Sequence, residues 1–103
     1  MLSEFDLIAR HFTRPARRTV LGVGDDAALV RVAEGRELVA AADMLLAGRH
    51  FFHDDEAEGV GHKSLAVNLS DLAAMGATPR WALLSIALPE ADERWIKGFA
   101  QGL

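Results

Sequence analysis

The chain has 103 residues, a formal net charge of −4 and no cysteine. This length favours a single domain, and the acidic balance argues against non-specific nucleic-acid binding, because phosphates require a basic surface. The lack of cysteine excludes disulfides and thiolate–metal sites. No run reaches the roughly 18 apolar residues of a membrane span, and the N-terminus does not resemble a signal peptide. We therefore expect a cytoplasmic protein whose partners include neither nucleic acid nor membrane.

The first third of the chain predicts a short helix followed by β-structure. Ser3 and Asp6 have the spacing of a capping box, so an amphipathic helix is expected to begin after Ser3 and to stop at Pro15. Residues 19–23 are typical of a strand that leads into an acidic loop. Residues 27–32 predict either the continuation of that strand or its partner.

The remaining two thirds predict two more strands and two helices. The apolar runs 37–43 and 81–88 are typical of strands covered on both faces. A long helix is expected over about 56–75, ended by Gly76, and Asp92 is placed to cap a last helix. Since the long helix is apolar around most of its circumference, we expect it to be buried on more than one side. Together these elements predict an α/β (α+β) fold, a mixed sheet packed with helices.

The acidic loop has the sequence Gly-Val-Gly-Asp-Asp-Ala-Ala at residues 22–28. Its glycines allow a sharp turn and a close approach to a ligand. The adjacent carboxylates of Asp25 and Asp26 repel each other unless a cation lies between or beside them. We interpret the loop as a source of oxygen ligands for a hard cation. A solvated turn is the alternative, since Gly-Asp pairs are common turn formers.

Two further aspartates lie at positions where ligands gather. Asp43 ends the predicted strand 37–43, and ligands of α/β folds bind at strand ends. Asp71 lies on the long helix, where it forms a polar stripe with Ser64 and Asn68 at i, i+4 and i+7. A polar stripe in an apolar helix is costly without partners. Its members either make internal hydrogen bonds to strand edges or bind a ligand, and the spacing alone leaves both open.

A transition-metal site is the less favoured interpretation of the histidine-containing segment that follows. His50, His53, Asp54 and Asp55 cluster in the sequence, and imidazoles three residues apart fit one helix face. Aspartates nearby and the lack of cysteine favour a hard cation instead.

Five sequence blocks carry a family resemblance. They read Glu-Phe-Asp-Leu-Ile-Ala-Arg at 4–10, Gly-Val-Gly-Asp-Asp-Ala-Ala-Leu at 22–29, Asp-Met-Leu at 43–45, Ala-Gly-Arg-His-Phe at 47–51 and Lys-Ser-Leu-Ala-Val-Asn-Leu-Ser-Asp-Leu-Ala-Ala-Met-Gly-Ala at 63–77. In this order they resemble the start of the thiamine-monophosphate kinase family, in the superfamily of aminoimidazole ribonucleotide synthetases and related ATP-using enzymes. The last block is the most specific, and the blocks follow one another in register from residue 4 to residue 77.

The resemblance implies ATP-dependent phosphorylation of thiamine monophosphate to thiamine diphosphate, with Mg²⁺ ions bridging the phosphates. It implies that Asp26, Asp43 and Asp71 ligate metal, with Asp25 as a weaker candidate, and that His50 contacts the substrate. Carboxylate and phosphate oxygens are the ligands that Mg²⁺ prefers, and no P-loop motif is present. The resemblance also implies that residues 1–103 form an N-terminal domain that binds metal and ATP and pairs as a homodimer.

The chain departs from the family pattern in two ways. Ala41 and Ala42 stand where the family has a serine or threonine before the strand-end aspartate, so a hydroxyl ligand is lost. Family enzymes are also several times longer, with a later Gly-Gly-Asp-Thr segment and a second domain. We therefore expect an N-terminal fragment with little activity alone.

Two alternatives to a thiamine-monophosphate kinase remain open. One is a sister enzyme of the superfamily that acts on selenide, a hydrogenase-maturation carboxamide or a purine intermediate. The other is a non-catalytic dimerisation module. The segment around His50 and the opening block at 4–10 favour the thiamine enzyme over its sisters.

Overall fold

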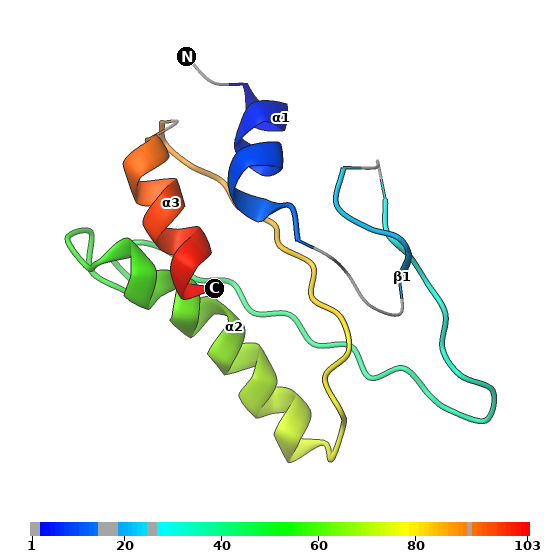
Figure 1. The fold of residues 1–103 in the computed structure, drawn as a ribbon. Helices are drawn as coiled ribbons and strands as arrows, with labels where there is room; N and C mark the ends of the chain where they lie inside the picture. The colour runs from blue at the N-terminus through cyan, green and yellow to red at the C-terminus, as the bar shows by residue number, and fades with distance from the viewer. Residues whose placement is uncertain (1–2, 15–18, 25–26, 91) are drawn as a thin grey trace. The chain divides into compact units, whose positions relative to one another are not determined.

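The computed structural model of the protein describes residues 3–14, 19–24, 27–90 and 92–103. Its elements, in chain order, are α1 (Glu4–Leu7), the π-helical turn η1 (Ile8–Phe12), β1 (Thr19–Leu21), β2 (Leu29–Val30), α2 (Ala57–Ala74) and α3 (Glu93–Gly102), several of which are labelled in Figure 1. The chain divides into two compact units, Met1–Leu38 with Leu88–Ala91 and Val39–Ala87 with Asp92–Leu103. The second unit carries α2, α3 and most of the predicted site residues.

The first helix begins at the predicted capping box. The Ser3 hydroxyl accepts the backbone N–H of Asp6 at 3.2 Å, and the Asp6 carboxylate accepts the backbone N–H of Ser3 at 3.2 Å. The hydroxyl of Ser3 also donates to this carboxylate, and together these bonds hold the pKa of Asp6 below its usual range. The helix continues as η1 to Phe12, and Thr13 is extended. Pro15, the predicted stop, lies outside the described residues.

The two predicted strands around the acidic loop pair with each other. β1 runs antiparallel to β2, with Thr19 opposite Val30 and Leu21 opposite Leu29. Residues 27–32 therefore supply the partner of the first strand rather than its continuation. Both strands are shorter than predicted, and two strands alone make a marginally stable sheet.

The strands predicted at 37–43 and 81–88 do not form. Neither segment carries strand structure, and both run as irregular chain in Figure 1. Ala40, Ala41 and Ala42 have low strand propensity, and the second segment contains one β-branched residue, Ile86. Without a ladder partner many of their apolar side chains are exposed, Leu38 by 60% and Leu83 by 88%. The predicted mixed sheet is thus not confirmed for the described part of the chain.

The long helix α2 ends as the sequence predicts. Gly76 has a φ of +68°, which a residue with a side chain rarely adopts. Its N–H donates to the carbonyl of Ala73 at 3.0 Å, and the N–H of Ala77 donates to the carbonyl of Leu72 at 2.9 Å. These two bonds are those of a Schellman motif, which satisfies the last carbonyl groups of the helix.

Helices α2 and α3 cross through small residues. A Cβ atom added at Gly61 would collide with the Phe99 carbonyl, and one added at Gly102 would collide with the carbonyl of Glu58. At Gly98 it would lie 3.2 Å from the Ala57 side chain. The two backbones therefore approach each other more closely than larger residues would permit.

The buried core of the described residues lies at this crossing. Four apolar residues are buried: Val60, Ile96, Phe99 and Ala100. The Trp95 ring stacks on Phe99 with a centroid separation of 5.3 Å, and the Asp92 carboxylate accepts the backbone N–H of Trp95, as predicted for the helix cap. The predicted burial of the long helix on several sides is wrong, because Val60 and Gly61 are its only buried residues and the strands expected to cover it do not form.

No helix in the described ranges combines the length and the apolar character required to cross a bilayer.

Candidate functional site

The second unit contains a cavity of about 260 Å³ next to α2. Two predicted site residues, Asp43 and His50, line it. Its lining consists of Asp43, Met44, Leu45, His50, Lys63 and Val67. The first four precede α2 in the sequence, whereas Lys63 and Val67 lie one turn apart on the helix. Segments separated by about 20 residues thus form one hollow that is lined by both polar and apolar side chains.

Asp43 and Asp71 are in contact, although 28 positions separate them in the sequence. A hydrogen bond to Asp71 raises the pKa of Asp43 above its ordinary value of 3.8, and desolvation and the negative charge of Asp71 act in the same direction. The electrostatic interaction with His50 acts in the opposite direction. Two carboxyl groups and an imidazole therefore share one electrostatic environment, as expected if they serve one ligand.

Asp25 and Asp26 lie outside the described residues, so the predicted third arm of the metal cluster has no described position. In the ranges that the structure describes, no three His, Asp or Glu side chains form a group that could hold a metal ion. This includes His53, Asp54 and Asp55. The pair Asp43–Asp71 supplies two ligands and would need oxygens from elsewhere to complete a coordination sphere.

The residues of the polar stripe on α2 have two kinds of partner: Ser64 and Asn68 bond within the helix, and Asp71 contacts another segment. The Ser64 hydroxyl donates to the carbonyl of Gly61 at 2.8 Å, and the Asn68 amide donates to the carbonyl of Ser64 at 2.9 Å. These bonds are internal to the helix, not to strand edges. The Asn68 side-chain oxygen is buried and lacks a hydrogen-bond partner in the described structure. Asp71 differs, because its partner is Asp43 on another segment.

His50 belongs to a tight turn over residues 46–51, called the His50 turn below. Its N–H donates to the carbonyl of Leu46 at 2.9 Å, and the N–H of Gly48 donates to the carbonyl of Phe51 at 2.7 Å. Gly48 has a φ of +80°, which permits this reversal. The backbone N–H of Leu46 donates to Nδ1 of His50 at 2.9 Å. Since Nδ1 accepts, the neutral imidazole carries its proton on Nε2.

Lys63 is the residue that the sequence interpretation missed. Its ammonium group donates to the carbonyl of His50 at 2.5 Å. It lies in the most specific of the quoted sequence blocks, but its residue type alone does not indicate a role. Two signals could have found it, since it is the only lysine or arginine in α2 and lies two turns before Asp71.

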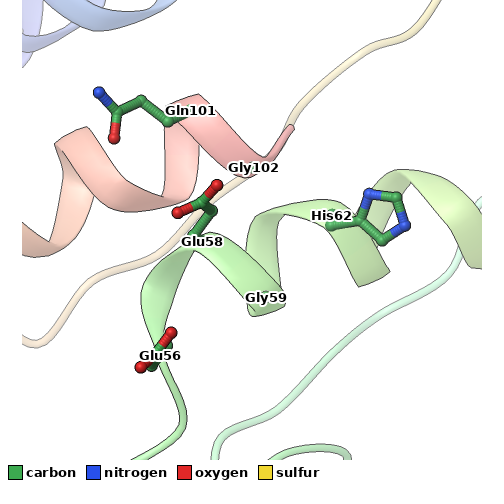
Figure 2. Close-up of a pocket in the computed structure, with 6 residues that line it drawn as sticks. All are labelled: Glu56, Glu58, Gly59, His62, Gln101 and Gly102. Carbon is green, nitrogen blue, oxygen red and sulfur yellow. The ribbon is translucent and has the colours of Figure 1, made fainter.

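A second cavity, of about 500 Å³, lies between α2 and α3 (Figure 2). It is lined by Glu56, Glu58, Gly59, His62, Gln101 and Gly102. Figure 2 shows that the side chains of Glu56, Glu58 and His62 do not converge on a common point. This hollow is therefore a less suitable cation or substrate site than the one at Asp43.

Comparisons with known proteins agree with the sequence resemblance. The chain is 48% identical to the thiamine-monophosphate kinase of Escherichia coli over 103 residues, which is 97% of this chain and 32% of that protein. The corresponding protein of Bacillus subtilis is 39% identical over 110 residues. A crystal structure of thiamine-monophosphate kinase from Stenotrophomonas maltophilia matches 93% of this chain and 30% of its own, with a TM-score of 0.76 and 49% identity.

The chain thus spans about a third of the length of the relatives that it matches. The predicted resemblance to thiamine-monophosphate kinases is confirmed by both kinds of comparison. The family model for the N-terminal domain of AIR synthase related proteins matches residues 24–103. Since this match covers most of the chain, the protein belongs to the family of AIR synthase related proteins.

Proposed function

We propose that this chain provides the metal-binding part of an enzyme that transfers a phosphoryl group from ATP to thiamine monophosphate, giving thiamine diphosphate. The identity to relatives named thiamine-monophosphate kinase supports this activity. The observation that carries the proposal is the contact between Asp43 and Asp71 beside His50. ATP is the phosphoryl donor, and its use is consistent with a reaction in the cytoplasm.

The donor set of this site fits Mg²⁺. The ion is commonly held by one or two carboxylates together with substrate phosphates and water, and the contact of Asp43 with Asp71 supplies such a pair. In the proposal Asp43 and Asp71 hold the metal, with Asp26 as a further ligand and Asp25 as a weaker one. When bound, Mg²⁺ would neutralise charge on the phosphates and help to position them.

The other residues of the cavity would bind and orient the substrate. In the proposal Nε2 of His50 donates its proton in a hydrogen bond to a substrate oxygen, because Nδ1 accepts from Leu46. The ammonium group of Lys63 adds positive charge to the same hollow, where anionic phosphates would lie. Ala41 and Ala42 can offer only backbone carbonyl oxygens. Positioning and charge neutralisation are the main requirements of phosphoryl transfer.

A chimera tests this proposal in a complete enzyme. In it, this chain replaces the matched third of the E. coli relative, and thiamine diphosphate formation is measured with ATP and Mg²⁺. We expect an active chimera, with Asp71→Asn and Asp43→Asn each lowering the rate at least ~100-fold through lost metal binding. Asp54→Asn is the matched control, because Asp54 does not line the cavity. Full activity of Asp71→Asn would contradict the assignment.

We also propose that the chain pairs with a second copy of itself. The support is the middle of the apolar segment 81–88, where three large apolar side chains are exposed in the described structure. Leu83 is 88% exposed, Leu84 43% and Ile86 40%, and apolar side chains exposed close together in the chain are typical of association sites. Sedimentation equilibrium of the chain should show a dimer that Leu83→Glu weakens. A monomer at all concentrations would contradict the pairing.

A further inference from the structure

We propose that Lys63 is a positioning residue that ties the His50 turn to α2 and thereby fixes the His50 imidazole at the cavity. The inference rests on the proposed function in one respect, namely that His50 contacts the substrate. It assigns a role to a side chain that acts through another residue.

The hydrogen bonds of the turn support this role. Those described for residues 46–51 close within the turn, as between Gly48 and Phe51 or between Leu46 and His50. The bond from Lys63 to the carbonyl of His50 instead connects the turn to a helix 13 positions further along the chain. A hydrogen bond with a charged donor is stronger than one between neutral groups. The turn is therefore internally ordered, and Lys63 determines where it sits.

The attachment point links this bond directly to the imidazole. Lys63 binds the carbonyl of the very residue whose side chain folds back onto the Leu46 N–H. Movement of that carbonyl would displace the imidazole and lengthen its bond to Leu46. The consequence is that the donor at Nε2 would lose its fixed direction, and substrate orientation would suffer.

A competing role for Lys63 is a solvated cation that attracts phosphate without ordering the turn. The two roles differ in what happens when no substrate is present. A positioning lysine orders the His50 turn in the chain alone, whereas a purely attractive charge does not. The conservative variant Lys63→Arg separates them further, because a guanidinium can also donate to a carbonyl.

Hydrogen exchange and imidazole ¹⁵N spectra of the 103-residue chain test the proposal. At about pH 8.5 we expect a non-protonated Nδ1, because this atom accepts the N–H of Leu46, and slow exchange at the amides of Leu46 and Gly48. Lys63→Met should speed this exchange about 10-fold, the effect of losing a charge-assisted hydrogen bond. It should also remove the hydrogen-bonded ¹⁵N shift of Nδ1. Lys63→Arg should restore most of both signals.

Two controls make the result decisive. Lys97→Met places the same change on an exposed lysine of α3 and should leave the turn unaffected. The amide of Ala77 reports on the end of α2 and should keep its exchange rate in Lys63→Met. Unchanged exchange at Leu46 and Gly48, or an equal loss of protection at Ala77, would overturn the positioning role.

The chimera distinguishes a failure of this inference from a failure of the proposed function. In an active chimera, Lys63→Met should raise the KM for thiamine monophosphate more than it lowers kcat, and Lys63→Arg should recover the affinity. An inactive chimera would refute the proposed function while the exchange result still stands. An active chimera with an unaltered KM in Lys63→Met would refute the positioning role alone.

Discussion

The two halves of α2 differ in what the chain places against them. Near the beginning of α2, the lack of a side chain at Gly61 allows the backbone of α3 to approach closely, and Val60 is buried there. Near its end, Asn68 is half-buried and Asp71 is exposed, next to a segment without strand structure. One continuous helix therefore carries close packing at one end and accessible polar chemistry at the other. The packed half can hold the helix in place while the open half presents Asp71 to a ligand.

The largest stability effect is expected from breaking the packed half. Gly61→Ala puts a Cβ against the Phe99 carbonyl, so the two backbones must separate, and we expect a loss of about 2–3 kcal/mol in the free energy of unfolding. Gly59→Ala is the matched control on the same helix, because nothing lies within 4 Å of its added Cβ. That variant should gain about 0.5–1 kcal/mol from helix propensity.

Urea denaturation followed by circular dichroism measures both glycine variants. Equal stabilities for Gly61→Ala and Gly59→Ala would show that the helices do not cross as described. The same experiment sharpens the comparison of the two halves, because neither substitution lies at the Asp43 cavity.

A smaller effect is expected from pH, and it has opposite signs at two exposed carboxyl groups. The pKa of Asp43 is raised by Asp71, so its contribution to stability is present below pH 3.8 and is lost as the pH rises through the raised value. The pKa of Asp6 is lowered by Ser3, so its contribution is present above pH 3.8 and is lost as the pH falls through the lowered value.

Carboxyl ¹³C titration of the metal-free chain checks this pair. The midpoint of Asp43 should lie above 3.8 and that of Asp6 below it. Asp71→Asn should lower the midpoint of Asp43, because it removes the like charge and supplies an amide donor. Midpoints on the same side of 3.8 would refute the contact at Asp43 or the capping box at Ser3.

Local signals explain which parts of the fold the sequence predicts. The residues that end the helices bond to partners only a few positions away, as Ser3, Asp92 and Gly76 do. Helix ends can therefore be predicted without knowledge of the rest of the chain. Strands depend on partners that are distant in sequence. The apolar runs 37–43 and 81–88 have strand-like composition in part, but no partner is described for either of them.

The candidate site shows the same division. The sequence predicts Asp43 and Asp71 as site residues from their surroundings, and the family resemblance adds His50. The structure brings these three residues together. Lys63 was not predicted, because its role depends on a carbonyl group 13 positions away, and a backbone acceptor leaves no trace in residue type. Asp25 and Asp26 stay predictions, since they lie outside the described residues.

Paramagnetic broadening by Mn²⁺, a substitute for Mg²⁺ with similar ligand preferences, tests most directly whether Asp43 and Asp71 form one cation site. At neutral pH, substoichiometric Mn²⁺ should broaden the amide signals around both residues, and the effect should vanish in Asp71→Asn and persist in Asp54→Asn. Broadening centred instead on the Glu56 and Glu58 cavity, or unchanged in Asp71→Asn, would contradict a shared cation site at Asp43 and Asp71.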